Sequence, residues 1–324
     1  MSYKRSITNK ALGIIEKRRN EAELEADRKR ENVFEKVPKI EKINDRLTAI
    51  GYETVVTTFS DAEKAQKLEK LEKLKQESLA LQEKRRLLLI ENGFNEDELN
   101  KNYTCKACND TGYVDGYYCT CLLDLRKQLQ KEEIARFADI NRCTFENFSL
   151  NCYPDSKPDG DTLTSKERAT KIFENCRTYA QTFTTNSKNL VIQGATGLGK
   201  THIALAIANV VINKGYSATY AEANSLLPSL VAEHFKRETF DYNLKNVIEA
   251  DLLIIDDLGS EDKSTVSNNC LMQVLNGRYN KPTIITTNLT GGEISELYDQ
   301  RITSRLLNRS WLYLTGEDIR SLNA

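Results

Sequence analysis

Eight residues near the middle of the chain match the phosphate-loop pattern G-x-x-x-x-G-K-S/T at every fixed position. Glycines let the backbone wrap closely around phosphates with its N–H groups pointing inward, and a following helix adds its positive N-terminal end. The lysine reaches the β- and γ-phosphates, and the hydroxyl after it can ligate Mg²⁺. The pattern therefore predicts a nucleotide site made of Gly194, Ala195, Thr196, Gly197, Leu198, Gly199, Lys200, Thr201 and the adjoining His202.

The flanking sequence agrees with this interpretation. Residues 189–193 (NLVIQ) are typical of a short buried strand, and residues 202–213 (HIALAIANVVIN) are typical of an apolar helix. A phosphate loop needs this strand-loop-helix setting, whereas a chance glycine-rich turn does not.

A second apolar run ends in two acidic residues. Residues 252–255 (LLII) lead directly into Asp256 and Asp257, the pattern of a Walker B strand. Such a strand delivers one carboxylate to the Mg²⁺ shell and a second towards the attacking water. We assign Asp256 to the metal and Asp257 to the water. Because Asp is one methylene shorter than the Glu more common there, slow ATP hydrolysis is expected.

Further polar residues follow the next apolar run. Asn288 ends residues 282–288 (PTIITTN) and could orient the attacking water from the other side. Arg301, Arg305 and Arg309 then recur at four-residue steps on an expected helix. An arginine exposed there can complete the site of a neighbouring subunit, and Arg305 is our candidate. The alternative, solvated arginines on a helix face, stays open for the other two.

Two close pairs of cysteines precede the nucleotide motif, separated by ten residues that include two glycines. A short hairpin of this kind can place four thiolates around one tetrahedral Zn²⁺, which would supply folding energy that the few apolar residues cannot. The predicted ligands are Cys105, Cys108, Cys119 and Cys121. Reduced, unligated thiols are the alternative. The scattered cysteines are expected to be small buried hydrophobic residues: Cys143, Cys152, Cys176 and Cys270.

Composition sets the broad class. A chain of 324 residues is long enough for about two domains, and 40% hydrophobic residues can supply a core. The net charge of -1 argues against a protein that coats nucleic acid, although it leaves room for a local basic patch. We find no signal peptide and no apolar run of about 18 residues, so we expect a cytoplasmic protein without a membrane partner.

The first hundred residues have helical composition. Residues 67–90 place leucines at mostly three- or seven-residue steps, which predicts an apolar stripe on a charged helix. Packing within its own domain is slightly favoured over a coiled coil with a partner. The stripe comprises Leu68, Leu71, Leu74, Leu81 and Leu88.

The remainder alternates strands with helices, which indicates an α/β fold with a parallel sheet flanked by helices on both faces. Ligands of such sheets bind at the carboxyl ends of the strands, where the phosphate loop is expected. Beyond the segments above, strands are expected at residues 217–222, 251–257 and 310–314, and helices at residues 122–139, 165–183, 225–237, 265–279 and 293–308.

Together these motifs resemble those of the DnaC/DnaI-type loaders of bacterial replicative helicases. These loaders are AAA+ P-loop ATPases related to DnaA and to the IstB transposition helper. The resemblance rests on the phosphate loop, IIDDLG at residues 254–259, TTN at 286–288 and SRLL at 304–307. TFENF at residues 144–148 looks like the segment that helps line the adenine pocket in these proteins. The resemblance as a whole covers roughly residues 100–324; the first hundred residues match these loaders in character more than in motif.

The resemblance implies a role for each matching residue. Lys200 and Thr201 would hold phosphate and Mg²⁺, Asp256 and Asp257 would form Walker B, and Asn288 would be sensor 1. Arg305 would be the arginine finger, and Arg320 in GEDIR would be sensor 2 and contact ATP. The family also implies contact with single-stranded DNA from the helices before Walker B, where residues 234–237 (HFKR) combine charge with an aromatic ring. An ordinary helix end is as good an interpretation of those four residues.

The expected function is an ATP-dependent loader that binds a DnaB-type helicase, assembles on it as a homo-oligomer and delivers it to single-stranded DNA. Two alternatives are an IstB-like transposition helper and an adaptor whose hydrolysis is incidental. The expected organisation is a helical helicase-binding region at 1–100, a zinc hairpin at 101–125, a connector at 126–160 and the AAA+ domain at 161–324.

Overall fold

The computed structural model describes residues 5–60, 63–235, 244–262 and 264–319. The chain divides into two compact units, residues 12–119 and residues 120–324 together with the first eleven. Within the described ranges, no helix is both long enough and apolar enough to cross a membrane.

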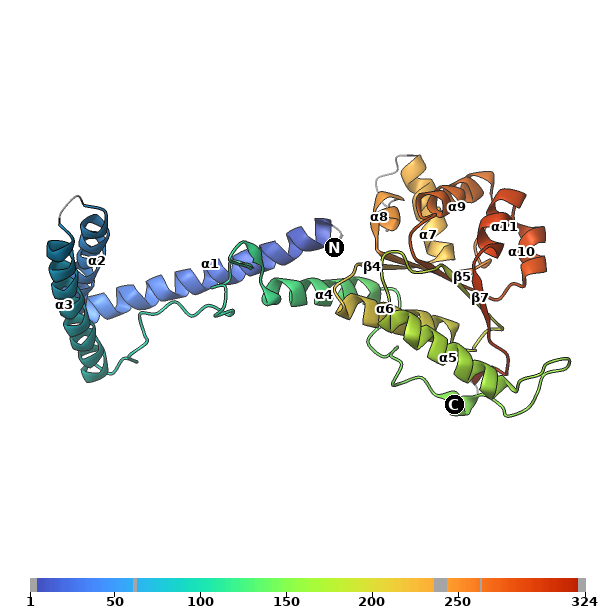
Figure 1. Cartoon of the computed structure of the whole chain (residues 1–324), viewed down its shortest axis with the longest axis horizontal. Coiled ribbons are helices and arrows are strands. Elements are labelled where there is room, and N and C mark those ends of the chain that lie inside the picture. The colour runs from blue at the N-terminus through green and yellow to red at the C-terminus, as the bar shows by residue number, and fades with distance from the viewer. Residues whose placement is uncertain (1–4, 61–62, 236–243, 263, 320–324) are drawn as a thin grey trace. The chain divides into compact units, whose positions relative to one another are not determined.

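The first unit is mainly helical, as its composition predicts. It contains α1 (Arg5–Lys36) from Leu12 onward, α2 (Pro38–Phe59) and α3 (Lys64–Glu91), and a short hairpin of β1 (Tyr113–Val114) and β2 (Tyr117–Tyr118) follows (Figure 1). Pro38 has no N–H to donate and therefore suits the first turn of α2, which separates that helix from α1. Helices α2 and α3 lie side by side, and Arg46 donates to both carboxylate oxygens of Glu77 at 2.7 and 3.0 Å.

The predicted leucine stripe packs over only part of α3. Leu74 is buried, and Leu88 is partly buried against a small core of Val33, Val37, Ile40 and Leu89, the last of which was not in the predicted stripe. Leu68, however, is 59% exposed. Packing against α2 therefore accounts for the middle and the end of α3 and leaves its first turns with an apolar residue in solvent.

The second unit holds the predicted alternation of strands and helices. Its elements, in chain order, are α4 (Thr120–Ala135), η1 (Leu150–Cys152), α5 (Ser165–Gln181), β3 (Leu190–Gln193), α6 (Lys200–Asn213), β4 (Ala218–Glu222), α7 (Ala223–His234), α8 (Leu244–Glu249), β5 (Leu252–Leu258), α9 (Thr265–Gly277), β6 (Thr283–Thr287), α10 (Gly291–Leu297), α11 (Gln300–Leu307) and β7 (Ser310–Tyr313).

The five strands form one parallel sheet in the order β4-β5-β6-β3-β7. Successive residues of a strand face opposite sides, and here Ile192 and Ile254 join the core beneath α5 and α6, while Val191 and Ile255 join the core beneath α7 and α9. Figure 1 shows these helices on the two sides of the sheet. The second unit thus has the predicted α/β fold, a parallel sheet flanked by helices on both faces, in which β6 lies between the phosphate-loop strand and the Walker B strand.

One expected helix is two helices. Residues 293–308 were expected to be continuous, but α10 ends at Leu297 and α11 begins at Gln300. Asp299 stands between them with extended backbone, and its Oδ1 accepts hydrogen bonds from the N–H groups of Arg301 and Ile302 at 2.9 and 3.0 Å. An aspartate that caps a helix in this way starts a new helix and ends the old one.

The scattered cysteines behave in two ways. Cys176 and Cys270 are buried, as expected, and burial raises the pKa of both thiols. Cys143 and Cys152 are only half-buried, so the expectation of full burial was wrong for these two.

A buried arginine fastens the amino-terminal end of β6 to the turn after α8. Arg278 is fully buried and donates to the carbonyl oxygens of Val247, Ala250 and Pro282 at 2.9, 2.7 and 2.6 Å. Burial lowers the pKa of its guanidinium to about 9. These carbonyls would lack this donor without it, and a buried unpaired acceptor costs about 1–3 kcal/mol.

Arg278→Ala should therefore lower the free energy of unfolding by about 3 kcal/mol or more, as measured by urea denaturation. Arg177 is a matched control, because its side chain is 51% exposed and its ion pair with Glu174 has an N–O distance of 4.0 Å. Arg177→Ala should cost less than about 0.5 kcal/mol. Equal losses for the two variants would contradict a structural role for Arg278.

Candidate functional site

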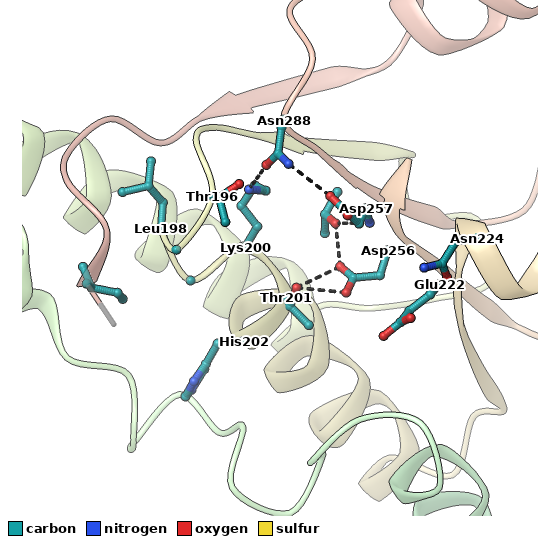
Figure 2. Close-up of a pocket in the computed structure, with 14 residues that line it drawn as sticks. Thr196, Leu198, Lys200, Thr201, His202, Glu222, Asn224, Asp256, Asp257 and Asn288 are labelled. Carbon is teal, nitrogen blue, oxygen red and sulfur yellow. Dashed lines mark hydrogen bonds between the residues drawn. The ribbon is translucent and has the colours of Figure 1, made fainter. Parts of the chain in front are cut away.

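A cavity of 460 Å³ lies at the carboxyl-terminal edge of the sheet, where α/β proteins bind ligands. Figure 2 shows the side chains that enter it from the phosphate loop and from the ends of β4, β5 and β6. It is lined by Thr196, Gly197, Leu198, Gly199, Lys200, Thr201, His202, Glu222, Asn224, Asp256, Asp257, Thr286, Asn288 and Ile319. Ten of the predicted residues are therefore brought together here.

The phosphate loop needs glycine at Gly197. Its φ of 81° is left-handed, and a Cβ there would lie 1.9 Å from Oδ1 of Asp318. The Ile319 N–H also donates to the Gly197 carbonyl at 3.2 Å, so the segment after β7 rests against the loop. This contact places residues 318–319 at the cavity.

Lys200 is held by the loop itself. Its Nζ donates to the carbonyls of Gly194 and Ala195 at 2.8 and 2.9 Å, and to Oδ1 of Asn288 at 2.5 Å. The side-chain amide of Asn288 in turn donates to Oδ1 of Asp257 at 3.2 Å, so Asn288 joins the lysine to the second acid (Figure 2). Gly194 and Ala195 thus take part through backbone oxygens although they do not line the cavity.

Asp256 is almost completely buried, with 4% exposure, and three hydroxyl groups hold its carboxylate. Thr201 donates at 2.9 and 3.0 Å, Thr286 at 2.5 Å and Tyr220 at 2.8 Å. A hydroxyl and a carboxylate are ligands that Mg²⁺ accepts together with phosphate oxygens. Thr201 and Asp256 are placed as such a pair, and Thr286 and Tyr220 fix the orientation of the carboxylate.

Asp257 reaches the same cavity because the strand is irregular at this point. In a regular strand, neighbouring side chains face opposite sides. The ladder between β5 and β6 shifts register between Ile255 and Leu258, and Asp257 has a left-handed φ of 54°. Its N–H donates to Oγ1 of Thr286 at 2.8 Å. This bulge lets two consecutive acids line one cavity.

Sequence reasoning missed four lining residues, namely Glu222, Asn224, Thr286 and Ile319. Glu222 ends β4 directly beside Asp256 in the sheet register. The sequence did carry one signal for Glu222: it is an acidic residue at the end of an expected strand of a parallel sheet, and the carboxyl ends of such strands bind ligands. Thr286 was quoted as part of TTN, but its bonds to both acids depend on the bulge and leave no trace in the sequence.

The segment at residues 144–148 lies beside the phosphate loop. The Thr144 carbonyl is 2.8 Å from Nε2 of His202, and the Phe148 ring meets the His202 ring edge-on at 5.3 Å. A Cβ on Gly199 would lie 2.8 Å from the Phe148 ring. The segment therefore packs against the first turn of α6, and the predicted site residue His202 makes the contact.

The predicted arginine residues lie elsewhere. Arg305 does not line the cavity; its Nε donates to Oδ1 of Asn276 at 2.7 Å and so joins α11 to α9. Arg301 is exposed, and Arg309 is half-buried at the amino-terminal edge of the sheet. Arg320 lies outside the described residues, as do Lys236 and Arg237, whereas Phe235 is described and 56% exposed.

The four predicted cysteine ligands gather in one cluster. Their sulfur atoms all lie within 4.8 Å of one another, and those of Cys105 and Cys119 are 3.8 Å apart. Four sulfurs at tetrahedral corners, each about 2.3 Å from a zinc ion, are separated by about 3.8 Å. A disulfide would need about 2.05 Å. The cluster, completed by Cys108 and Cys121, could therefore hold a zinc ion.

Backbone geometry around the cluster fits a metal-binding turn. The Gly112 N–H points to Sγ of Cys108 at 3.4 Å. Asp110, which is buried and has a left-handed φ of 51°, accepts from the N–H groups of Thr104 and Cys105 at 2.7 and 2.9 Å. The turn is thus held by its own hydrogen bonds around the thiol groups.

Comparison with known proteins agrees with this geometry. Residues 162–313 match the family model described as IstB-like ATP binding protein, so the chain carries an IstB-like ATP-binding domain. The replicative helicase loader DnaC of Escherichia coli K12 is a distant homologue, 24% identical over 184 residues that span 55% of this chain and 69% of DnaC.

Two further similarities extend the comparison. An ATP-binding protein of insertion sequence IS5376 from Geobacillus stearothermophilus is 30% identical over 145 residues, which span 43% of this chain and 57% of that protein. The crystal structure of the DnaC helicase loader aligns with a TM-score of 0.43 and 24% identity, covering 53% of this chain and 98% of that one.

The cysteine cluster makes a direct prediction about metal content. The purified chain should carry about one zinc ion by elemental analysis, and Cys108→Ser should lose most of it, because removing one thiolate opens the tetrahedral site. Cys152→Ser is the control, since Cys152 lies outside the cluster, and it should keep the zinc. A metal-free wild type, or equal loss in both variants, would rule the site out.

Proposed function

We propose that this protein is an ATP-dependent loader of a replicative DNA helicase. The observation that carries the proposal is the convergence of Lys200, Thr201, Asp256, Asp257 and Asn288 on one cavity at the carboxyl edge of a parallel sheet. Each of these side chains has a role in phosphoryl transfer. The homologous DnaC of Escherichia coli is named a replicative helicase loader, and that name supports the choice of partner.

In this proposal Lys200 and the loop N–H groups bind the phosphates of ATP, and Thr201 and Asp256 hold Mg²⁺. Asp257 accepts a proton from the attacking water, and Asn288 orients both Asp257 and Lys200 through its two hydrogen bonds. Bound Mg²⁺ would neutralise charge on the transferred phosphoryl group. Arg305 is proposed to act on the site of a neighbouring copy, and Arg320 to contact ATP.

We propose that residues 1–100 and the cysteine hairpin grip the helicase, and that residues 161–324 assemble with ATP and deliver the ring to single-stranded DNA. The support is an exposed apolar face on α2. Tyr52, Val55, Val56 and Phe59 recur at helical spacing on α2 and are 74%, 56%, 49% and 83% exposed. Exposed apolar side chains grouped on one face are typical of protein interfaces.

A transposition helper is the second candidate. The family match and the insertion-sequence relative both favour it. Such a protein would share the nucleotide chemistry but bind a transposase and duplex DNA. The cysteine cluster and the helical first unit lie outside residues 162–313, so they are the parts that distinguish the candidates.

Hydrolysis should depend on Asp257. Asp257→Asn keeps the shape and the contact with Asn288 but removes the base, so turnover of ATP should fall by about 100-fold or more with ATP affinity nearly unchanged. Glu222→Gln should lower turnover by a smaller factor, because Glu222 lines the cavity beside Asp256. Asp262 is exposed and outside the cavity, and Asp262→Asn should turn over ATP like the wild type. Unchanged turnover in Asp257→Asn would contradict its role as the base, and loss of loading by this variant with ATP binding intact would argue against the adaptor alternative.

The loader proposal is tested by co-purification with the replicative helicase of the host, with ATP and Mg²⁺ present. The full-length chain should form a stable complex, and the double variant Tyr52→Ser, Phe59→Ser should lose it by at least tenfold in affinity, since apolar anchors dominate such interfaces. Tyr279→Ser is the control, because Tyr279 is 72% exposed but lies in the other unit.

Two outcomes would contradict the proposal. The absence of a complex under every nucleotide condition would shift the assignment to the transposition helper, and a transposase would then be the bait. A complex that survives the double variant and fails with Tyr279→Ser would place the grip outside the first unit.

A further inference from the structure

A second cavity lies at the other edge of the sheet. Its volume is 700 Å³, and the residues that form it lie shortly before β3 and β6 and at the start of β7. These are the amino-terminal ends of strands whose carboxyl-terminal ends lead to the nucleotide-binding side. The two cavities share no lining residue, and the proposed chemistry uses nothing in the second one.

The lining of this cavity is polar and basic. Its nine residues include Lys188, Arg309 and four asparagines, and none of them is acidic. Among the described residues, no carboxylate lies within salt-bridge distance of Lys188 or Arg309. Two cations without a facing acid, in a wall rich in amide donors, suit an anion better than a cation or an apolar ligand.

Arg309 is held in place by two backbone contacts and still has N–H groups available to a ligand. Its Nε donates to the Arg305 carbonyl at 3.1 Å, and its Nη1 lies 3.5 Å from the Thr283 carbonyl. Its Nη2 donates to no acceptor within the described part of the chain. A guanidinium anchored on one side presents its remaining N–H groups with little loss of entropy, which favours binding of a phosphate group.

The electrostatic surroundings favour a bound anion. Burial lowers the pKa of the Arg309 guanidinium to about 10, and the charge of Arg309 contributes to the lowered pKa of Arg278 nearby. Two guanidinium groups that are withdrawn from water and repel each other are both stabilised when an anion binds between or beside them.

One aromatic side chain completes the lining. Tyr279 stands at the rim and is 72% exposed, although α9, which precedes it, is packed on the sheet. An exposed ring next to basic and amide groups is the combination that binds single-stranded nucleic acid, where bases stack on aromatic rings and cations follow the phosphates. Side-chain amides add hydrogen bonds to base edges.

We propose that this cavity binds a phosphodiester of single-stranded nucleic acid, with Lys188 and Arg309 on the phosphate and Tyr279 stacked on an adjoining base. The site lies apart from Phe235 and the helix end where the sequence suggested contact with DNA, so it adds a second contact. It rests on the proposed function only in the nature of the partner, because the cavity exists whether or not ATP is hydrolysed.

The test measures the binding of a fluorescently labelled oligothymidylate to the full-length chain by anisotropy, at low and at moderate salt. Tyr279→Ser should weaken binding about tenfold, in keeping with the loss of one stacked base. Lys188→Glu should also weaken binding about tenfold at low salt. The slope of log affinity against log salt concentration should become shallower by about one, the value for one lost phosphate contact. Arg309→Lys keeps the positive charge but removes the paired N–H donors of the guanidinium. It should therefore weaken binding less than Lys188→Glu does.

A matched control comes from an exposed lysine of the same unit. Lys171 is exposed on α5, and Lys171→Glu should bind the oligonucleotide like the wild type. Tyr279→Ser, Lys188→Glu and Lys171→Glu should all bind the helicase and ATP like the wild type. A failure of the oligonucleotide prediction is therefore distinguishable from a failure of the loader proposal.

Three results would overturn the inference. One is wild-type affinity in both Tyr279→Ser and Lys188→Glu, with loss only in Phe235→Ala. Another is equal loss in the Lys188→Glu and Lys171→Glu variants, which would reflect general electrostatics. The third is calorimetric binding of inorganic phosphate that Lys188→Glu abolishes, while oligonucleotide affinity is unchanged; the ligand would then be free phosphate.

Discussion

The nucleotide site depends on one local constraint, the left-handed backbone at Asp257. A strand that continued regularly past Asp256 would turn the next carboxylate to the other face of the sheet. The bulge keeps both acids in the cavity. The Thr286 hydroxyl stabilises it by hydrogen bonds to both residues, because it accepts from the Asp257 N–H and donates to the Asp256 carboxylate. A non-glycine residue with φ of 54° is strained, and such strain is commonly kept where function requires the geometry.

The same constraint fixes the orientation of Asn288. Its amide oxygen accepts from Lys200 and its amide nitrogen donates to Asp257, so exchanging the two ends would set an N–H₂ group against an ammonium group. Lys200 is otherwise satisfied by two loop carbonyls. Phosphate oxygens must therefore compete with Gly194, Ala195 and Asn288 for the lysine, and the carboxylate of Asp257 feels that exchange through one side chain.

The sequence predicted the parts of this site that follow from short patterns, and it missed those that follow from tertiary register. The phosphate loop, the acidic strand end and the cysteine pairs are each visible within about twenty residues. Glu222 enters the cavity because β4 lies next to β5, and strand order is not written in either segment. The break between α10 and α11 was readable at Asp299, but helical periodicity across it concealed the cap. Arg278 gave no signal, because nothing local distinguishes a buried arginine from an exposed one.

The two edges of the sheet are close enough to share a scaffold and far enough apart to hold two anions. Asn189 joins the starts of three strands, since its side chain accepts from the Thr283 N–H and its carbonyl from the Ser310 N–H. Strand β3 then runs only four residues to the phosphate loop, a span of roughly 13 Å at 3.3 Å per residue. Physiological salt screens charges over about 8 Å. Phosphates at the two edges would therefore repel each other weakly, while the strands between them keep their spacing fixed.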